Sequence, residues 1–554
     1  MSKEEVVPAV LEGPPLVVRD DYRSILDVFD VACRQYAKRP AFSCMGATLR
    51  FDELWQLADR FARWVVEHSG MAPGERLAVV LPNLLQYPVV VFGALRAGLV
   101  VVNTNPLYTA DEMRHQFEDA GVSGVVIFAH MLDTLEKVRE YVAIEHVIVT
   151  EVGDLHPLPA RLKYNLGARW VTRQAPRRHP AGALALRDAL HKGRGTTPVE
   201  RGGSGDDVAI LQYTGGTTGT PKGAMLSHAN LVANMLQTGE VLGSAVKRGE
   251  ETIIAPLPVY HIYTFTVNCM FGLESGCHSV FIANPRDLDG FVKTLAKQPF
   301  TAFIGLNTLF AALVQREDFK RLDFSALHLS VSGGMALNAA TAERWERVTG
   351  SAVLEGYGMT ETAPVVCVNP PGALQLGSIG RPVAGTRLCV MDEQGRQLDL
   401  DTPGELCIDG PQVMQGYWQQ EDDGLVDGWV HSGDIAVLQR DGYVRIVDRK
   451  KDMIVTSGFN VYPNEVEEVL MHHEAVYDAA VVGVPDENCG ERVVAFIVAQ
   501  RGATADAAAL KSWCHEQLAG YKVPRRFEFR DKLPRSNVGK VLRRALRDEI
   551  SSEK

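Results

Sequence analysis

Short apolar runs that look like buried strands alternate with helix-like stretches over the first two hundred residues. The runs at 76–81, 99–103, 125–129 and 146–152 follow this pattern, and it resumes between 252 and 355. Strands that alternate with helices form βαβ units, which build parallel sheets covered by helices on both faces. The sequence therefore predicts an α/β protein with doubly wound sheets.

The pattern changes twice towards the C-terminal end. Residues 377–447 contain short β-rich pieces separated by Gly, Pro and Asp turns, which is typical of a small barrel or meander. A charged run at 448–452 then precedes a self-contained α+β pattern. We predict a multidomain α/β and α+β protein. Its large N-terminal domain, residues 1–449, holds two doubly wound sheets and a small β-barrel, and a small mobile α+β domain covers residues 450–554.

Composition excludes several classes of protein. The chain has 554 residues, which is too long for one core, and a formal net charge of -11, which argues against nucleic-acid binding. Its nine cysteines include no C-x-x-C pair, so neither a zinc site nor a disulfide framework is indicated. The N-terminus lacks the features of a signal peptide, and no apolar run is long enough to span a bilayer. These observations predict a cytoplasmic protein.

One segment has an unusual balance of charge. Residues 159–179 contain six basic side chains and no acidic one, interleaved with aromatic and aliphatic residues such as Tyr164 and Trp170. A basic segment with an apolar face can lie on an anionic membrane surface. The alternative is a solvated helix in an inserted loop. We therefore consider peripheral association with the inner face of the cytoplasmic membrane.

Residues 213–223 read YTGGTTGTPKG and carry the strongest functional signal. Glycines let the backbone approach a ligand closely, and threonine hydroxyls, backbone N–H groups and a lysine suit phosphate oxygens. The apolar run 208–212 precedes this loop, and a helix-like stretch follows from Ser227. A glycine-rich loop after a strand is where α/β proteins hold phosphates. The loop is not a Walker A motif, because Pro221 and Gly223 stand where that motif needs Gly and Ser/Thr. A flexible surface loop is the alternative.

Further motifs follow this loop in a fixed order. They are PVYH at 258–261, Gly333-Gly334, EGYGMTETAP at 355–364, HSGD at 431–434, VDRKKDM at 447–453, SGFNVYPNE at 457–465 and LPRSNVGKVLRR at 533–544. Together with the loop they resemble the adenylate-forming superfamily of acyl-CoA synthetases, adenylation domains and luciferases, from about Tyr22 to the C-terminus. Within it, NLLQYPVVVFGALRAG, VVNTNPLYT and VTSGFNVYPNE are most similar to bacterial long-chain fatty-acid–CoA ligases.

The resemblance implies a two-step reaction. A fatty acid and ATP, with Mg²⁺, would form an acyl-adenylate and pyrophosphate, and coenzyme A would then displace AMP to give the thioester. Positioning and electrostatic stabilisation would dominate both steps, because charge develops on phosphate oxygens.

The resemblance also assigns residues of the large domain. Those that would hold the β- and γ-phosphates are Thr214, Thr217, Thr218 and Lys222. Glu361, beside Thr360, would bind Mg²⁺, although an acid near a helix start is an alternative interpretation. The residues that would surround the nucleotide and the acyl group are Gly333, Gly334, Glu355, Gly356 and Tyr357. His261 would act as a lid, with Phe265 and Thr308 along the acyl tunnel. Tyr263 is a neighbouring alternative to Phe265 in this role, and ordinary core is the other interpretation of Phe265.

Five residues complete the expected site. Asp434 would bind the ribose hydroxyls and Arg449 the same sugar or the phosphate. Lys540 would bridge the attacking carboxylate and the α-phosphate in the adenylation step. Lys451 aligns with a hinge about which the small domain turns between half-reactions, and Gly458 would then pass close to the pantetheine arm of coenzyme A.

The sequence departs from the family pattern at two positions. Ser432 replaces the usual threonine of Thr-Gly-Asp and keeps a hydroxyl. Val455 stands where some relatives carry a lysine, which implies that the corresponding contact in the thioester-forming state is not used here.

Two other functions stay open at this point. One is a fatty-acyl-AMP ligase that loads a carrier protein, and the other is a non-catalytic fatty-acid-binding regulator. A homodimer is considered as well, and the sequence leaves the preferred acyl chain length open.

Overall fold

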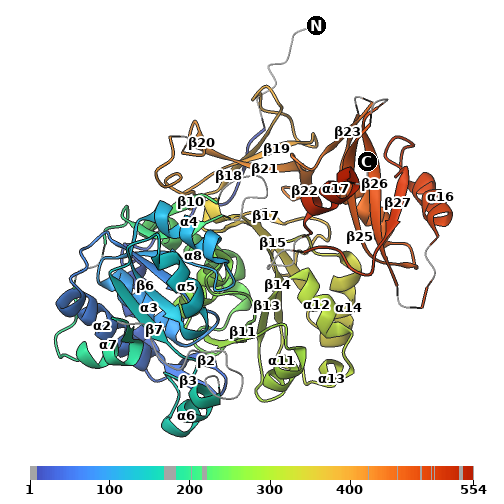
Figure 1. Ribbon diagram of the computed structural model, residues 1–554. Coiled ribbons are helices and arrows are strands. Elements are labelled where there is room, and N and C mark those ends of the chain that lie inside the picture. The colour runs from blue at the N-terminus through green and yellow to red at the C-terminus, as the bar shows by residue number, and fades with distance from the viewer. Residues whose placement is uncertain are drawn as a thin grey trace. The chain divides into compact units, whose positions relative to one another are not determined.

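The computed structural model describes residues 9–167, 182–200, 203–214, 221–421, 423–457, 459–486, 489–500, 502–503, 506–535 and 541–552 (Figure 1). The chain forms two compact units. The large unit comprises Glu12–Arg387 and Asp409–Val430, and the small unit comprises Met1–Leu11, Leu388–Ile408 and His431–Lys554. The boundary at residues 449 and 450 that the sequence suggests remains a proposal for where the mobile domain begins.

The large unit contains a seven-stranded sheet that is parallel except at one edge. Its strands, in spatial order, are β10 (Gly223–Ser227), β9 (Val208–Tyr213), β5 (Val100–Asn103), β4 (Arg76–Val80), β6 (Val122–Phe128), β7 (His146–Thr150) and β8 (Leu184–Ala185). Strands β10 and β9 pair antiparallel, whereas β9, β5, β4, β6, β7 and β8 pair parallel. This arrangement confirms the predicted βαβ units.

A nine-stranded sheet forms the second half of the large unit. Its strands, in spatial order, are β17 (Arg381–Pro382), β16 (Val365–Val368), β15 (Val353–Gly358), β14 (Leu329–Ser332), β13 (Ala302–Gly305), β11 (Thr252–Ala255), β12 (His278–Phe281), β2 (Pro40–Cys44) and β3 (Ala47–Arg50). The central strands from β15 to β2 pair parallel, and the strands at both edges pair antiparallel.

Helices cover both faces of both sheets, as the alternating pattern predicts. The longer helices of the large unit are α1 (Ile25–Gln35), α2 (Phe51–Trp64), α3 (Gln86–Arg96), α4 (Ala110–Ala120), α5 (Leu132–Arg139), α6 (Leu158–Leu166), α7 (Leu186–Lys192), α8 (His228–Leu242), α11 (Leu288–Leu295), α12 (Asn307–Val314) and α14 (Ala339–Thr349). The short helical segments are η1 (Val65–Ser69), η2 (Ala129–Met131), η4 (Gly243–Ala245), α9 (Ile262–Thr264), η5 (Phe265–Phe271), α10 (Gly272–Glu274), α13 (Glu317–Lys320) and η6 (Thr360–Thr362).

Strand residues alternate between separate cores. In β4, Leu77 and Val79 enter a core that also includes residues of the nine-stranded sheet and of α1, α2, α3 and α8, whereas Ala78 and Val80 enter a core with α4 and α5. Helices α11, α12 and α14 pack on the outer face of the nine-stranded sheet (Figure 1). Successive strand side chains point to opposite faces. The two sheets therefore share one central helical layer.

Helix α3 lies within this shared layer and is buried along its whole length. Its sequence QYPVVVFGALR has no polar stripe, as expected of a helix with protein on every side. Gly93 allows α2 to approach closely, because a Cβ atom there would lie 2.7 Å from the Ala58 carbonyl oxygen. The apolar run at residues 88–95 is therefore part of a buried helix.

A six-stranded sheet contains most strands of the β-rich region predicted for 377–447. Its spatial order is β1 (Leu11–Glu12), β18 (Arg387–Met391), β19 (Gly404–Asp409), β21 (Trp429–Leu438) and β20 (Leu425–Val426), and β22 (Val444–Arg449) also pairs with β21.

The C-terminal part of the small unit has its own sheet and helices. The strands run in the order β24 (Phe459–Val461), β23 (Ile454–Thr456), β26 (Gly490–Ala499) and β25 (Val476–Asp486), with β27 (Arg526–Phe529) parallel to β26. The helices are α15 (Pro463–Met471), α16 (Ala507–Gln517) and α17 (Arg543–Ser552). This is the α+β pattern that the sequence predicts.

Two further expectations concern the whole chain. All nine cysteines lie in the described part of the chain, and each is a buried free thiol. Among the described residues, none of the helices has the length and apolar character needed to cross a membrane.

Candidate active site

The glycine-rich loop is carried by a β-hairpin. Strand β9 ends at Tyr213, which lies opposite Gly223 at the start of β10, and the Thr214 N–H donates to the Lys222 carbonyl at 3.0 Å. The helix after the loop, α8, begins only at His228, where the Ser227 side chain accepts from the Asn230 N–H. Strand β10 was missed by the sequence analysis. Thr217 and Thr218 lie outside the described residues.

A second segment lies along β10 and brings an aromatic ring to the loop. The Met225 N–H donates to the Gly416 carbonyl at 2.9 Å, and the Trp418 N–H donates to the Gly223 carbonyl at 2.8 Å. Between these contacts, the Tyr417 ring lies 5.0 Å from Lys222 Nζ. A lysine at this distance is attracted by the face of the ring. The position of Lys222 is therefore set by Tyr417 as well as by the hairpin.

Tyr417 also joins the loop to Glu361. Its hydroxyl donates to Glu361 Oε1 at 2.7 Å, and the Met414 N–H donates to the Glu361 carbonyl at 2.8 Å. Glu361 is buried within η6, beside Thr360. Hydrogen bonds to a carboxylate are short and strong. The structure thus connects two residues predicted from separate motifs, Lys222 and Glu361, through a third that the sequence analysis did not single out.

The side chains around Glu361 supply only part of the ligand set that a hard cation needs. Among the described residues, no group of three or more acidic, histidine or cysteine side chains could hold a metal ion. Mg²⁺ is usually held by one or two carboxylates together with water and substrate phosphates. Glu361 can supply one such carboxylate, because Tyr417 fixes its Oε1 atom. The site therefore fits a magnesium ion that arrives with a nucleotide.

Four neighbouring parallel strands end at the same edge of the nine-stranded sheet. These strands are β11, β13, β14 and β15. In open α/β sheets, ligands bind outside the carboxyl ends of the strands. His261 follows β11, Thr308 follows β13, Gly333 and Gly334 follow β14, and Glu355, Gly356 and Tyr357 end β15. The structure thus gathers the residues predicted from four motifs at one edge.

The two glycines after β14 are required by their surroundings. A Cβ atom on Gly333 would lie 3.0 Å from the Tyr263 ring, and Gly334 has a φ of +78°. A positive φ is strained for any residue with a side chain. The backbone at Gly333 and Gly334 is therefore left bare, because a side chain at either position would crowd Tyr263 or strain the chain.

The residues predicted for the acyl side occupy different environments. His261 caps α9, where its Nδ1 atom accepts from the Tyr263 N–H at 3.3 Å. Thr308 is half-buried in α12, and its hydroxyl lies 4.0 Å from the Met335 sulfur. Phe265 is fully buried within the central core. A tunnel role for Phe265 therefore stays a prediction.

Glu355 is a buried acid with a perturbed pKa. Its carboxylate accepts from the Leu337 N–H at 2.9 Å, and the residue is 7% exposed. Burial raises the pKa of Glu355 to about 7, and the hydrogen bond from Leu337 opposes this rise. The native state therefore keeps the proton over a pH range in which an unfolded glutamic acid has lost it.

Glu355→Gln should remove one component of the pH dependence of stability. Between the unfolded pKa near 4.5 and the native pKa near 7, the free energy of unfolding falls with rising pH by about 1.4 kcal/mol per unit on account of this group. The glutamine can still accept from Leu337, so the variant should gain stability over the native protein by about 3 kcal/mol as pH rises through this window. Urea unfolding at several pH values measures the difference. Glu343→Gln, on the exposed face of α14, is the matched control and should show no such gain. An equal pH dependence in the native protein and Glu355→Gln would contradict the prediction.

The small unit pairs two of the predicted residues directly. Asp434 on β21 and Arg449 on β22 lie opposite each other, and Arg449 Nε lies 2.7 Å from Asp434 Oδ1. Asp434 is buried and its N–H donates to the Ser432 hydroxyl at 3.1 Å, so the serine that departs from the family pattern contributes a contact. Asp434 and Arg449 therefore form an ion pair, and their roles toward a nucleotide stay a proposal.

Lys451 follows this pair in a turn. Burial lowers its pKa below the usual value for a lysine. The neighbouring Lys450 donates to Glu405 Oε2 at 2.8 Å. Two other predicted residues of this part of the chain, Gly458 and Lys540, lie outside the described residues.

Comparison with known proteins places the chain in a family. The family model described as AMP-binding enzyme matches residues 29–418, and the model described as AMP-binding enzyme C-terminal domain matches residues 465–540. The chain belongs to the AMP-binding enzyme family.

Curated relatives narrow this class. The chain is 47% identical over 540 residues to a long-chain-fatty-acid–CoA ligase of Escherichia coli O157:H7, with 97% of this chain and 96% of the relative covered. The enzyme of the same description from Haemophilus influenzae is 43% identical, and the alignment covers 95% of each chain.

Solved structures share the fold. ATP-bound MatB from Rhodopseudomonas palustris superposes with a TM-score of 0.79 at 29% identity, with 95% of this chain and 99% of the other covered. The anthranilate CoA ligase AuaEII in complex with anthranoyl-AMP superposes with a TM-score of 0.85 at 24% identity, with 97% and 99% covered.

Proposed function

We propose that this protein is an AMP-forming ligase that joins medium- or long-chain fatty acids to coenzyme A. The observation that carries the proposal is the contact of Tyr417 with both Lys222 and Glu361, which brings a lysine and a carboxylate together at the base of the glycine-rich loop. The membership of the family and the extended similarity to long-chain-fatty-acid–CoA ligases support it.

The reaction needs two steps because a carboxylate is a poor acyl donor. In the first step a carboxylate oxygen attacks the α-phosphorus of ATP, the bond to the β-phosphate oxygen breaks, and pyrophosphate leaves. In the second step the thiol of coenzyme A attacks the acyl carbon, loses its proton, and displaces AMP. No oxidation or reduction takes place.

The residues of this chain would hold charge in the first step. Lys222 and Thr214, at the base of the hairpin, would bind phosphate oxygens, with Thr217 and Thr218 from the loop. Glu361, fixed by Tyr417, would hold Mg²⁺. The ion would neutralise charge on the phosphates during the displacement. Lys540 would stabilise the charge that develops at the α-phosphate.

Other residues would orient the substrates. The bare backbone at Gly333 and Gly334 and the end of β15, with Glu355, Gly356, Tyr357 and Thr360, would line the adenine and the acyl group. Asp434 would accept hydrogen bonds from the ribose, and Arg449, which holds Asp434 at 2.7 Å, would orient it. His261, Thr308 and Phe265 would lie along the acyl side. Lys451 would act as the hinge, and Gly458 would lie near the pantetheine arm.

Release of AMP tests the function. The purified protein should release AMP from ATP in the presence of saturated and unsaturated acids from acetate to oleate, with faster turnover for longer chains and only when coenzyme A is present. Each methylene buried in an acyl tunnel adds about 0.8 kcal/mol, so the preference should rise steeply with chain length. Turnover with a phosphopantetheinylated carrier protein and not with coenzyme A would favour the carrier-loading alternative. A lack of acid-dependent AMP release would favour the regulator.

We also propose that the protein binds anionic membranes through α6. Leu158, Leu162 and Leu166 are 57%, 51% and 50% exposed and recur every fourth residue, and the helix buries no side chain. Residues spaced by four share one face of a helix. The Tyr164 hydroxyl donates to the Met45 carbonyl at 3.1 Å and holds α6 beside the β2–β3 hairpin (Figure 1). Residues 168–179, the rest of the basic segment, lie outside the described residues.

Replacing the exposed leucines should weaken membrane binding. Leu158→Ser combined with Leu162→Ser should lower the partition coefficient into phosphatidylcholine–phosphatidylglycerol vesicles by about tenfold or more, because two half-exposed leucines lose their contact with lipid. Leu376→Ser, at a residue that is 48% exposed, is the matched control. Co-sedimentation measures the binding. Unchanged partitioning of the double variant, or no binding of the native protein to these vesicles, would contradict the proposal.

The homodimer considered from the sequence stays a prediction. Sedimentation of the pure protein tests it.

A further inference from the structure

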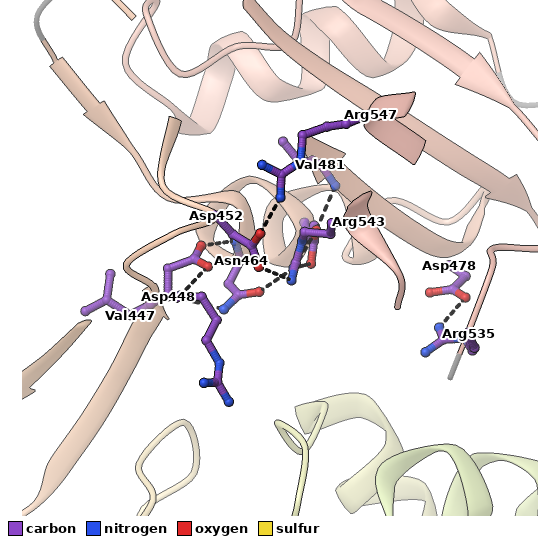
Figure 2. Close-up of polar contacts among 11 residues, drawn as sticks. Val447, Asp448, Asp452, Asn464, Asp478, Val481, Arg535, Arg543 and Arg547 are labelled. Atoms are coloured by element: carbon purple, nitrogen blue, oxygen red, sulfur yellow. Dashed lines mark hydrogen bonds and ion pairs between the residues drawn. The ribbon is translucent and has the colours of Figure 1, made fainter. Parts of the chain in front are cut away.

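Arg543 lies at the centre of a buried polar cluster in the small unit (Figure 2). It is the first residue of α17, and its side chain is only 16% exposed. Its Nη2 atom donates to Asn464 Oδ1 at 2.8 Å and to Glu467 Oε2 at 2.8 Å. Asn464 and Glu467 both belong to α15. The guanidinium therefore fastens the start of α17 to α15.

The same arginine reaches the turn that contains Lys451. Arg543 Nη1 lies 3.6 Å from Asp452 Oδ2, and Arg547, one turn further along α17, lies 2.6 Å from Asp452 Oδ1 (Figure 2). The side chain of Asp452 is 10% exposed. Helix α17 thus binds the residue that directly follows Lys451.

Asp448 attaches the other side of this turn. Its carboxylate accepts from the Asn464 N–H and from the Arg449 N–H, each at 2.7 Å, and the residue is fully buried. Burial raises the pKa of Asp448 to about 7, while the hydrogen bond from Asn464 and the charge of Arg543 lower it. Asn464 therefore bridges Asp448 and Arg543, and both ends of the turn depend on the same cluster.

One further hydrogen bond connects the cluster to the sheet of the small unit. The Val481 N–H on β25 donates to Glu467 Oε1 at 2.7 Å, so the carboxylate that binds Arg543 is itself held by the sheet. Burial alone would lower the pKa of Arg543, but the carboxylates of Glu467, Asp448 and Asp452 raise it above its usual value. A planar guanidinium with several donors suits such a junction, whereas an ammonium group on a flexible stem does not.

We propose that Arg543 is a positioning residue for adenylation, which ties the C-terminal helix α17 to α15 and to the turn that contains Lys451. Lys540, the residue proposed to act on the α-phosphate, precedes Arg543 by three positions in the sequence. The inference rests on the proposed function, because it takes Lys540 to be the residue that acts in adenylation. Loss of the junction should displace the chain around α17 and slow the half-reaction that depends on Lys540, and should spare the other half-reaction.

The two half-reactions of Arg543 variants test this role. Arg543→Gln should lower kcat for acyl-adenylate formation by about a hundredfold, the scale of loss expected from a displacement near 1 Å, with KM for ATP almost unchanged. Arg543→Lys keeps the charge and should recover part of the rate. Thioester formation from supplied acyl-adenylate should stay within about threefold of the native rate, because an effect limited to one half-reaction is what positioning, and not general destabilisation, produces.

Controls separate this role from folding and from the proposed function. Arg544→Gln changes the adjacent residue, which is 76% exposed and pairs only with Asp548 among the ion pairs observed in the described residues, and it should behave as the native protein. Glu467→Gln removes the carboxylate that binds Arg543, and the double variant Arg543→Gln/Glu467→Gln removes both charges of this pair. They should repeat the selective loss even if Arg543→Gln alone does not fold. Equal losses in both half-reactions, or native adenylation in folded Arg543→Gln or in the double variant, would overturn the inference. If Lys540→Ala loses adenylation while the folded Arg543 variants keep it, the inference about Arg543 is overturned and the proposed function stands. If the native protein releases no AMP, the proposed function itself is overturned.

Discussion

Lys540→Ala should lower the rate of acyl-adenylate formation by about a thousandfold and leave thioester formation from supplied acyl-adenylate nearly intact. A donor placed where charge develops in a transition state contributes on the order of a hundredfold to a thousandfold in rate. In the second step the thiol of coenzyme A attacks the acyl carbon and AMP leaves. No carboxylate attacks the α-phosphate in this step, so the proposed role of Lys540 is not needed. Pyrophosphate exchange measures the first step, and AMP release from synthetic acyl-adenylate measures the second.

The decisive result is that Lys540→Ala loses adenylation and keeps thioester formation. Lys532→Ala, in the same C-terminal region, is a suitable control because its side chain is exposed and lies outside the proposed site. Equal loss in both half-reactions of Lys540→Ala would show that the lysine supports the structure, or both steps, and would contradict the assigned role.

Glu361→Gln should cause the second large loss. The glutamine can still accept from the Tyr417 hydroxyl at the position of Oε1, so the local packing is retained while the negative charge is removed. We expect kcat for adenylation to fall by about a hundredfold or more, and the Mg²⁺ concentration needed for half-maximal rate to rise, because an oxygen ligand without charge binds a hard cation weakly. Titration of the initial rate with Mg²⁺ at fixed ATP measures both quantities.

Tyr417→Phe distinguishes the metal ligand from its support. It removes the 2.7 Å hydrogen bond but keeps the aromatic ring near Lys222, so the loss should be nearer tenfold. A Glu361→Gln variant with a native Mg²⁺ dependence would contradict the assignment of Glu361 as the ligand.

Much of the fold could be predicted from local patterns. Strand β4 is apolar after Arg76 and helix α3 is almost wholly apolar between Gln86 and Arg96, and such runs are typical of parallel strands and of helices buried on every side. The short β-rich pieces between 377 and 447 and the final α+β segment are also found where the sequence predicts them. Strand β10 was missed because its five residues, GAMLS, directly precede the capped start of α8 and offer no turn of their own.

The site could be predicted less completely than the fold. Motif order identified Lys222 and Glu361, but not their connection, because Tyr417 reaches both only after the segment around Gly416 pairs with β10, almost two hundred residues away in the chain. Arg543 was overlooked for a similar reason. A run of arginines near a C-terminus resembles a solvated surface, and the burial of one of them depends on carboxylates and an amide that lie about eighty residues earlier.

The fully buried helix α3 restricts how the large unit can deform. The central core that contains it is shared by the seven-stranded and nine-stranded sheets, so the two sheets cannot slide or open against each other without exposing a whole apolar helix to water. Exposing even part of such a surface costs several kcal/mol. The large unit should therefore behave as a stiff block and unfold in a single cooperative transition.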